Sequence, residues 1–135
     1  MSTNSSASSL VELVSPDGFE ATVDRLVDAI RSAGLLVIAR IDHAGGARTA
    51  GLSLPPSLVL VYGHPLGGTP IMQAHPAAAL DLPLRVLIRT ADDGRTVVSF
   101  HPVADLLAPY GVPAEMAGRL EPAQALIRRA LGQPA

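Results

Sequence analysis

The stretch "LRVLIRTADDGRTVVSF", residues 84–100, determines the topology of the chain, because it predicts two antiparallel strands joined by a tight turn. Branched aliphatic residues dominate both arms, as is typical of strands. The Asp93-Gly94 pair between them accepts the positive backbone dihedral angles that a short hairpin turn demands. A central hairpin without regular alternation of strands and helices around it favours a mainly antiparallel sheet.

Two turns fit this hairpin, and they differ in which side chains share a face of the sheet. A two-residue turn at Asp93-Gly94 would pair Leu87 with Phe100 and mix arginine side chains with the core. A three-residue loop from Asp92 to Gly94, with Gly94 left-handed in a bulge, shifts the pairing by one residue. We predict this second register because it separates apolar from polar side chains. It places Val86 and Ile88 on one face with Val98 and Phe100, and on the other face Arg85, Leu87 and Arg89 with Val97, Ser99 and His101.

Residues 10–34 predict a short strand followed by an amphipathic helix. The segment "LVELV" is typical of a strand, and Asp17 with Glu20 three residues later resembles a capping box at the start of a helix. Apolar residues then recur at helical spacing, and Gly34 is expected to end the helix. The predicted buried stripe comprises Phe19, Val23, Leu26, Val27 and Ile30.

Two further strands and several short helices are expected around the hairpin. The runs "LLVIARI" (35–41) and "SLVLVYG" (57–63) predict strands, the first of them buried on at least one side. Between Gly67 and Leu80 we expect one or two helical turns, with Thr69 as the cap and Pro70 at the first helical position. The other helical segments are expected at residues 102–107 and after Pro113 and Pro122.

The elements together predict one α+β domain over residues 10–135, preceded by a Ser-rich flexible tail over residues 1–9. Helices are expected to gather on one face of the mainly antiparallel sheet. A chain of 135 residues is long enough for one core. Aromatic residues make up only 3% of the chain, so that core must consist of Leu, Val, Ile and Ala.

Composition excludes several classes of function. The chain has a net charge of −2 and lacks the clustered basic residues that nucleic-acid binding needs, so no nucleic-acid partner is predicted. The chain has no cysteine, which excludes disulfides and thiolate chemistry. No apolar run approaches the length of a membrane span and no signal peptide is apparent, so we predict no membrane partner and a cytoplasmic location.

Several segments resemble the domain-of-unknown-function family number 302, over roughly residues 19–110. Its most specific pieces are the Gly63-His64-Pro65 turn, the stretch "GTPIM" (68–72) and the run "LDLPL" (80–84) before a strand. The resemblance implies a compact domain with the order β-α-β-β-β-β-α, similar to the TATA-binding-protein-like fold class, and a dimer. It implies no known reaction, and the family pattern places Asn where His64 stands here.

The turn around His64 is the first candidate ligand site. Gly63 and His64 follow directly on a strand, where the backbone opens to a ligand, and the imidazole can bind a ligand or transfer protons near neutral pH. The alternative is a turn residue whose ring hydrogen-bonds a nearby backbone group. Gly68 and Thr69, before a possible helix, offer N–H groups that can hold an anion, although the spacing of a phosphate-binding loop is missing.

A second group of candidates lies in and around the hairpin. The predicted register places Arg85 across from His101, on the sheet face away from the first helix, where a bound anion or a dimer partner can use both. Arg89 and Ser99 share that face. Asp81 is expected either to pair with an arginine or to bond the following turn, with ligand binding as the alternative.

Neither a metal site nor a cofactor nor a catalytic residue is assigned. No two of the four histidines have the short spacing typical of metal ligands. Ser99 and His101 lie two apart on one strand, but a Ser-His pair without an orienting carboxylate is weak evidence for catalysis.

Two functions follow as hypotheses. The first is a homodimeric module that binds or senses a small molecule beside the turn at His64. The alternative is a small enzyme that uses His64 or His101 as general base, with Arg85 or Arg89 holding an anionic substrate.

Overall fold

The computed structural model describes residues 9–135 and contains a five-stranded antiparallel sheet. The strands lie in the order β1-β5-β4-β3-β2, and every neighbouring pair is antiparallel. Most of the tail predicted over residues 1–9 lies outside the described residues. The strands are β1 (Val11–Val14), β2 (Leu36–Asp42), β3 (Ser57–Gly63), β4 (Leu84–Thr90) and β5 (Thr96–Phe100).

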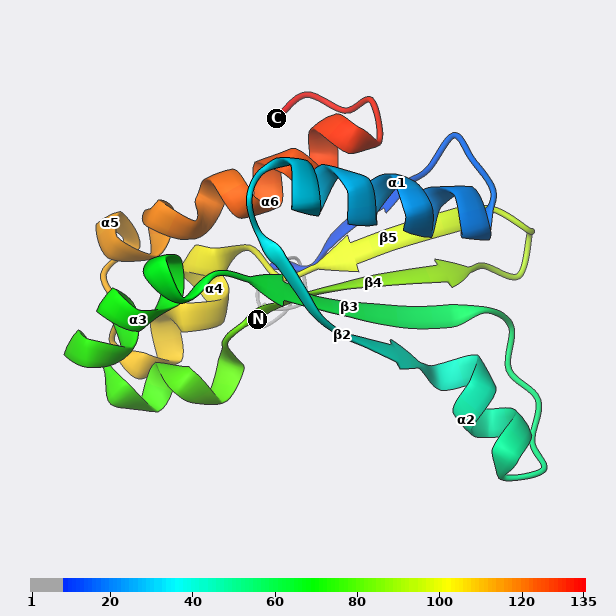
Figure 1. Cartoon of the computed structure of the whole chain (residues 1–135), viewed down its shortest axis with the longest axis horizontal. Coiled ribbons are helices and arrows are strands. Elements are labelled where there is room, and N and C mark those ends of the chain that lie inside the picture. The colour runs from blue at the N-terminus through cyan, green and yellow to red at the C-terminus, as the bar shows by residue number, and fades with distance from the viewer. Residues whose placement is uncertain (1–8) are drawn as a thin grey trace, which may run out of the picture.

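The helices confirm the predicted α+β layout. Two of them, α1 and α6, lie side by side across one face of the sheet, while α3, α4 and α5 gather at one end and α2 projects from the other (Figure 1). The helices are α1 (Phe19–Ser32), α2 (His43–Thr49), α3 (Pro65–Ala74), α4 (Val103–Leu107), α5 (Ala114–Ala117) and α6 (Glu121–Ala130), with the 3-10 turns η2 (Pro76–Asp81), η3 (Ala108–Tyr110) and η4 (Gly118–Leu120).

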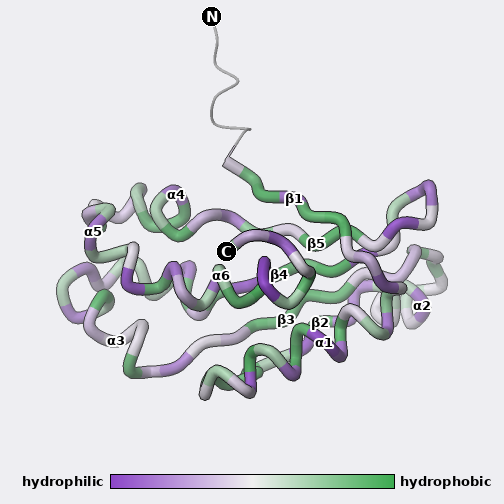
Figure 2. Tube along the Cα trace, turned by 90° about the horizontal axis from the view of Figure 1, so that it is seen from above, coloured by the Kyte–Doolittle hydropathy of each residue, from purple (hydrophilic) through white to green (hydrophobic). Residues whose placement is uncertain are grey.

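The core fills the space between the sheet and the two long covering helices. Leu26 and Ile30 of α1 and Ile127 of α6 are completely buried, in one cluster with Val86 and Ile88 of β4. The hydrophobic stretches of the strands run beneath α1 and α6 when the molecule is seen from above (Figure 2). Burial of each such side chain contributes about 1.5–3 kcal/mol relative to exposure. Aliphatic packing therefore holds the helices on this face.

The register predicted for the central hairpin is confirmed. Leu87 lies opposite Ser99 and Ile88 opposite Val98, as the three-residue loop requires. Gly94 has φ +86°, and its N–H donates to the carbonyl oxygen of Ala91 at 2.9 Å. This combination is a tight turn followed by a left-handed glycine in a bulge.

No helix among the described residues lies across the second face of the sheet (Figure 1). Val59 of β3 and Leu87 of β4 lie opposite each other there and are half-buried. Ile41 and Val14, on the two outer strands, are 43% and 41% exposed on the same side. We call this surface the open face.

The prediction that residues 35–41 form a strand buried on at least one side is wrong in its second part. The segment does form β2, but β2 is the outermost strand and most of its residues are exposed. A bulge between Val37 and Ala39 turns Ile38 outward, where it is 51% exposed. A continuous apolar run is typical of a strand in a sheet interior, and here it belongs to an edge.

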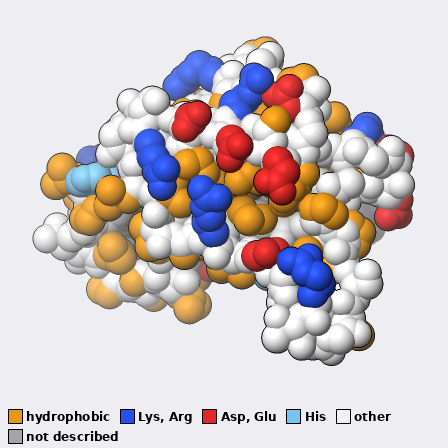
Figure 3. Space-filling view, turned by 45° about the vertical axis from the view of Figure 1, so that its right-hand side comes forward, with side chains coloured by type: hydrophobic (Ala, Val, Ile, Leu, Met, Phe, Trp, Pro, Cys, Tyr) orange, Lys and Arg blue, Asp and Glu red, His pale blue; other side chains and the backbone are white. Residues whose placement is uncertain are grey.

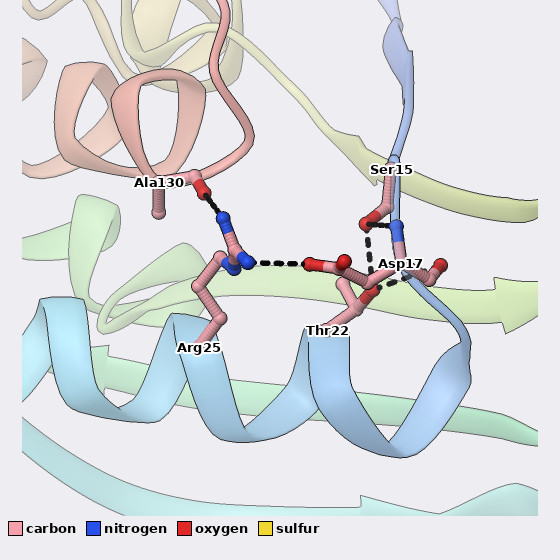
Figure 4. A network of polar contacts seen from close by, with 5 residues as sticks. All are labelled: Ser15, Asp17, Thr22, Arg25 and Ala130. Atoms are coloured by element: carbon pink, nitrogen blue, oxygen red, sulfur yellow. Dashed lines mark hydrogen bonds and ion pairs between the residues drawn. The ribbon is translucent and has the colours of Figure 1, made fainter.

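The start of α1 also differs from the prediction. Gly18 is the N-cap residue and no side chain caps the helix, so the capping box of Asp17 and Glu20 is absent. Asp17 instead forms an ion pair of 2.7 Å with Arg25, whose guanidinium also donates to the carbonyl oxygen of Ala130 at the end of α6 (Figure 4). The carboxylate thereby links the chain entering α1 to the two covering helices.

A buried hydroxyl pair fixes the same turn from the inside. The hydroxyls of Ser15 and Thr22 lie 2.6 Å apart, and the Ser15 oxygen also accepts the N–H of Asp17 (Figure 4). Both side chains are buried, so the bonds replace those that water would make.

We expect the substitution Gly94→Ala to lower the free energy of unfolding by about 1–2 kcal/mol, because a left-handed conformation costs that much for a residue with a Cβ atom. The matched control is Gly46→Ala in α2, where a Cβ atom meets open space and φ is not positive. There alanine should stabilise the helix by about 0.5–1 kcal/mol. Urea unfolding of both variants makes the comparison, and equal effects would contradict the turn assignment.

Candidate functional site

A cavity of about 750 Å³ opens at the end of β3, directly beside the predicted turn. Its walls come from the C-terminal end of α1, the start of α3, the segment before β4 and the start of α6. Hydrophobic side chains gather at the end of the molecule that carries α3, while acidic and basic side chains alternate over α1 (Figure 3). The apolar lining includes Ile38, Leu66, Met72, Leu82, Leu120 and Leu126.

His64 lies at the rim of this cavity as the N-cap residue of α3. Its Nδ1 atom accepts the N–H of Leu66 at 3.1 Å, which satisfies one of the unpaired donors at the helix start. The alternative in which the ring bonds a nearby backbone group is thus confirmed. Since Nδ1 is an acceptor, the neutral ring carries its hydrogen on Nε2, which remains able to donate to a ligand.

The predicted start of the helix at Thr69 and Pro70 is wrong. The helix begins at Pro65, so Gly68 and Thr69 already lie inside its first turns and Pro70 is within the helix. The N–H groups of Gly67 and Gly68 both donate to the carbonyl oxygen of His64. The N–H group of Gly68, which the sequence offered as a donor to an anion, is therefore already used inside the protein.

Close packing of α3 on η4 depends on a glycine in this segment. A Cβ atom placed on Gly67 would lie 3.2 Å from Cδ2 of Leu120, which is tighter than normal contacts. A Cβ atom on Gly68 would instead lie 3.6 Å from Cε of Met72 and 3.8 Å from Cδ1 of Leu82, at ordinary contact distances. The wall at Gly68 thus leaves room that a side chain can fill.

Tyr62 closes the inner end of the cavity. Its side chain is 1% exposed, and its hydroxyl donates to the carbonyl oxygen of Ala123 at 2.8 Å. Burial raises the pKa of Tyr62, so the hydroxyl stays protonated and acts as a structural donor.

Few polar side chains line the cavity. Besides His64 and the buried Tyr62 they are Thr69, on α3, and Arg119, in η4. Arg119 is exposed, and no aspartate or glutamate among the described residues lines the cavity. A mostly apolar cavity with a few polar groups at its mouth is typical of small-molecule sites.

The other predicted site residues lie outside this cavity. Arg89 and Ser99 project from the open face, where Glu12 of β1 lies 3.6 Å from the Arg89 guanidinium and accepts the Ser99 hydroxyl at 3.4 Å. The structure thus supplies a carboxylate beside Ser99 that the sequence could not place. His101 follows β5 and is exposed, and its carbonyl oxygen accepts Nε2 of the buried Gln124 at 2.7 Å.

Asp81 makes contacts within the protein, including the predicted pairing with an arginine. Its carboxylate accepts the hydroxyl of Tyr110 and lies 3.5 Å from the Arg85 guanidinium. The hydrogen bond to Asp81 raises the pKa of Tyr110. The Arg85 side chain thus points toward η2. The strand pairing of the hairpin ends at Leu87 and Ser99, so it does not reach the predicted pair of Arg85 and His101.

One wall of the cavity could not be predicted from the sequence. Arg119 and Leu120 stand more than fifty residues after the turn at His64, in a segment predicted only as a broken helix. Their contribution depends on the packing of η4 against α3. Within residues 9–135 no cluster of three or more His, Asp or Glu side chains could hold a metal ion.

Residues 11–133 match the family described as "Domain of unknown function DUF302". The chain belongs to this family. The chain is similar to a solved structure of an uncharacterised conserved DUF302 protein from Bacillus stearothermophilus, with a TM-score of 0.79 and 15% sequence identity. The match covers 92% of the present chain and 96% of the Bacillus chain. At that identity the likeness establishes a shared fold.

Two curated relatives carry the name of a channel. The DUF302 chain is 40% identical over 80 residues to "Fluoride-specific ion channel FluC 1" of Brucella suis, a match that covers 59% of this chain and 32% of the relative. The protein of the same name from Brucella abortus matches over 80 residues with 40% identity and 30% coverage of its own length. The DUF302 chain thus spans about a third of the curated relatives it matches.

Among the helices of residues 9–135, none combines the length and the apolar composition that crossing a bilayer requires.

We expect His64→Asn to change the free energy of unfolding by less than about 0.5 kcal/mol, because asparagine is also a favourable N-cap residue. The variant His64→Ala removes the acceptor for the Leu66 N–H and should cost about 1 kcal/mol. Chemical unfolding measures both. A loss above about 2 kcal/mol for the asparagine variant would contradict the capping role and indicate a more extensive buried network.

Proposed function

We propose that this DUF302 domain is a homodimeric module that binds a small, largely apolar molecule in the cavity beside His64. The cavity itself supports the proposal, since its volume of about 750 Å³ falls within the range of roughly 300–1,000 Å³ typical of ligand sites. The lining is mostly aliphatic, and the N–H groups of Leu66, Gly67 and Gly68 already donate to His64. An apolar body with a small polar end matches such a lining best.

The enzyme alternative receives less support from the geometry. It needs His64 or His101 as general base together with Arg85 or Arg89 on an anionic substrate, yet neither arginine lines the cavity that His64 borders. Nδ1 of His64 is occupied by the Leu66 N–H, which leaves only Nε2, a donor in the neutral ring. A general base needs a free acceptor within hydrogen-bond reach of its substrate.

Fluoride is a second candidate ligand because the Brucella relatives are named as fluoride-specific channels. Fluoride is a small anion that loses its hydration only to several strong donors, and burial of an unpaired charge is costly. The aliphatic lining of the cavity offers few such donors. We therefore favour an organic ligand and use fluoride as a separate arm of the binding experiment.

The open face supports the homodimer part of the proposal. Half-buried Leu87 and Val59 lie at its centre, and exposed Ile41 lies at one edge. Antiparallel sheets of this kind often bury one face on a core and need either water or a partner on the other. The exposed Ile41 and Val14 on this face favour a partner, and two copies of one face can pack about a twofold axis.

We expect decanol, as a neutral apolar probe, to raise the melting temperature of the wild-type domain by several degrees, because a ligand of the native state stabilises it. Gly68→Leu should abolish this shift by filling the wall between Met72 and Leu82. The matched control Gly46→Leu places the same side chain in open space on α2 and should retain the shift.

Binding of fluoride alone, without decanol binding, would contradict an apolar ligand. If Gly68→Leu fails to fold, Gly68→Ala provides the smaller test, and it should weaken decanol binding without loss of stability.

We expect sedimentation of the wild-type chain at micromolar concentration to give twice the monomer mass of 13.9 kDa. Leu87→Arg would bury an unpaired charge in the interface, which costs several kcal/mol and should shift the mass to that of the monomer. Ile41→Arg, at an exposed position of the same face, should act in the same direction without risk to the core. Ala21→Arg, on the exposed side of α1, is the control and should stay dimeric.

A wild-type chain that sediments only as a monomer would refute the dimer. It would leave the proposal for the cavity intact.

A further inference from the structure

The polar groups at the mouth of the cavity are donors rather than acceptors. His64 presents an Nε2 hydrogen, since its Nδ1 atom already accepts the Leu66 N–H. Arg119 presents five N–H donors and no acceptor. The Thr69 hydroxyl can donate as well as accept. A polar group of a ligand that meets these three side chains must therefore act mainly as an acceptor.

The positive charge in the cavity lining also favours an acceptor group on the ligand. Among the described residues that line the cavity, Arg119 carries the formal charge, and it forms no ion pair with a carboxylate. Four arginines, Arg25, Arg85, Arg89 and Arg95, each have an acidic partner within 4.0 Å, and the other described arginines have none. Arg119 differs from the other unpaired arginines because it lines this cavity. An exposed guanidinium at the mouth of an apolar cavity attracts an anion and remains partly hydrated while it does so.

The backbone N–H groups at the start of α3 indicate which kind of anion can bind. A phosphate group is usually held by several free N–H groups at a helix start. Here the N–H groups of Leu66, Gly67 and Gly68 all donate to His64, through its ring or its carbonyl oxygen. The remaining side-chain donors suit the two oxygens of a carboxylate, which guanidinium groups bind in a bidentate manner.

The aliphatic walls define the rest of the molecule. Met72 on α3 and Leu126 on α6 both line the cavity, Met72 half-buried and Leu126 buried, and the flexible thioether of Met72 adapts to irregular shapes. Tyr62 offers no free hydroxyl, since its proton is given to Ala123. The inner part of the cavity is therefore suited to hydrocarbon.

From these observations we infer that the ligand of the cavity is an amphipathic monocarboxylate, with its carboxylate held by Arg119 at the mouth and its hydrocarbon body inside. The inference rests on the proposed function and names the ligand class of that same cavity. It assigns Arg119 as a residue that determines ligand specificity.

Calorimetric titration with decanoate and decanol tests the inference, because the two probes share a chain and differ in the terminal group. The wild-type domain should bind decanoate at least about 10-fold more tightly than decanol, and added salt should reduce the difference. Arg119→Gln should weaken decanoate binding far more than decanol binding, so that the preference for decanoate is lost. Arg119→Lys should restore part of the preference, since it keeps the charge without the planar donor pair.

The control variant Arg48→Gln removes an arginine of α2, at the opposite end of the sheet, and should keep the full preference for decanoate. Decanol binding without a preference for decanoate would overturn the monocarboxylate and leave the proposed cavity in place. Decyl phosphate binding more tightly than decanoate would overturn it in favour of a phosphate ligand. Binding of neither decanol nor decanoate would overturn both proposals.

Discussion

The hydrogen bond between the Tyr62 hydroxyl and the Ala123 carbonyl oxygen, at 2.8 Å, is the contact on which the arrangement of the cavity depends. It ties the end of β3 to the first turn of α6 inside the core. A buried hydroxyl without a partner costs about 1–3 kcal/mol, so α6 cannot slide along the sheet freely. Because η4 leads directly into α6, the same bond sets the position of Leu120 and Arg119 relative to α3.

Sequence reasoning succeeded where a local pattern had one physical solution. The hairpin register followed from Gly94 and from the need to separate arginine side chains from the core, both of which the sequence displays. It failed where two solutions look alike. Pro65 and Pro70 can each begin a helix, and the capping His64 selected the earlier one. The apolar run of β2 carries no mark of its place at the sheet edge, which depends on strand order.

The two groups of candidate residues lie in two separate places. His64 and Gly68 border the cavity, whereas Arg89 and Ser99 lie on the open face with Glu12. Alternation along β4 and β5 correctly predicted that Arg89 and Ser99 share a face, but it could not place Glu12 beside them. The cavity was predictable only on the side of the turn, because its other wall comes from a distant segment that joins it through tertiary packing. The proposed ligand site and the proposed dimer surface therefore lie on separate parts of this chain.

The bulge in β2 has a consequence for how the domain behaves at high concentration. An unpaired edge strand with apolar side chains is a template to which further chains can add. Lysine side chains often prevent such addition at sheet edges, and this chain has no lysine. The irregular pairing between Val37 and Ala39 lies near the start of that strand and bends it there. An added strand would meet a regular run of donors and acceptors only over residues 39–42. We therefore expect the bulge to limit the addition of further chains at this edge.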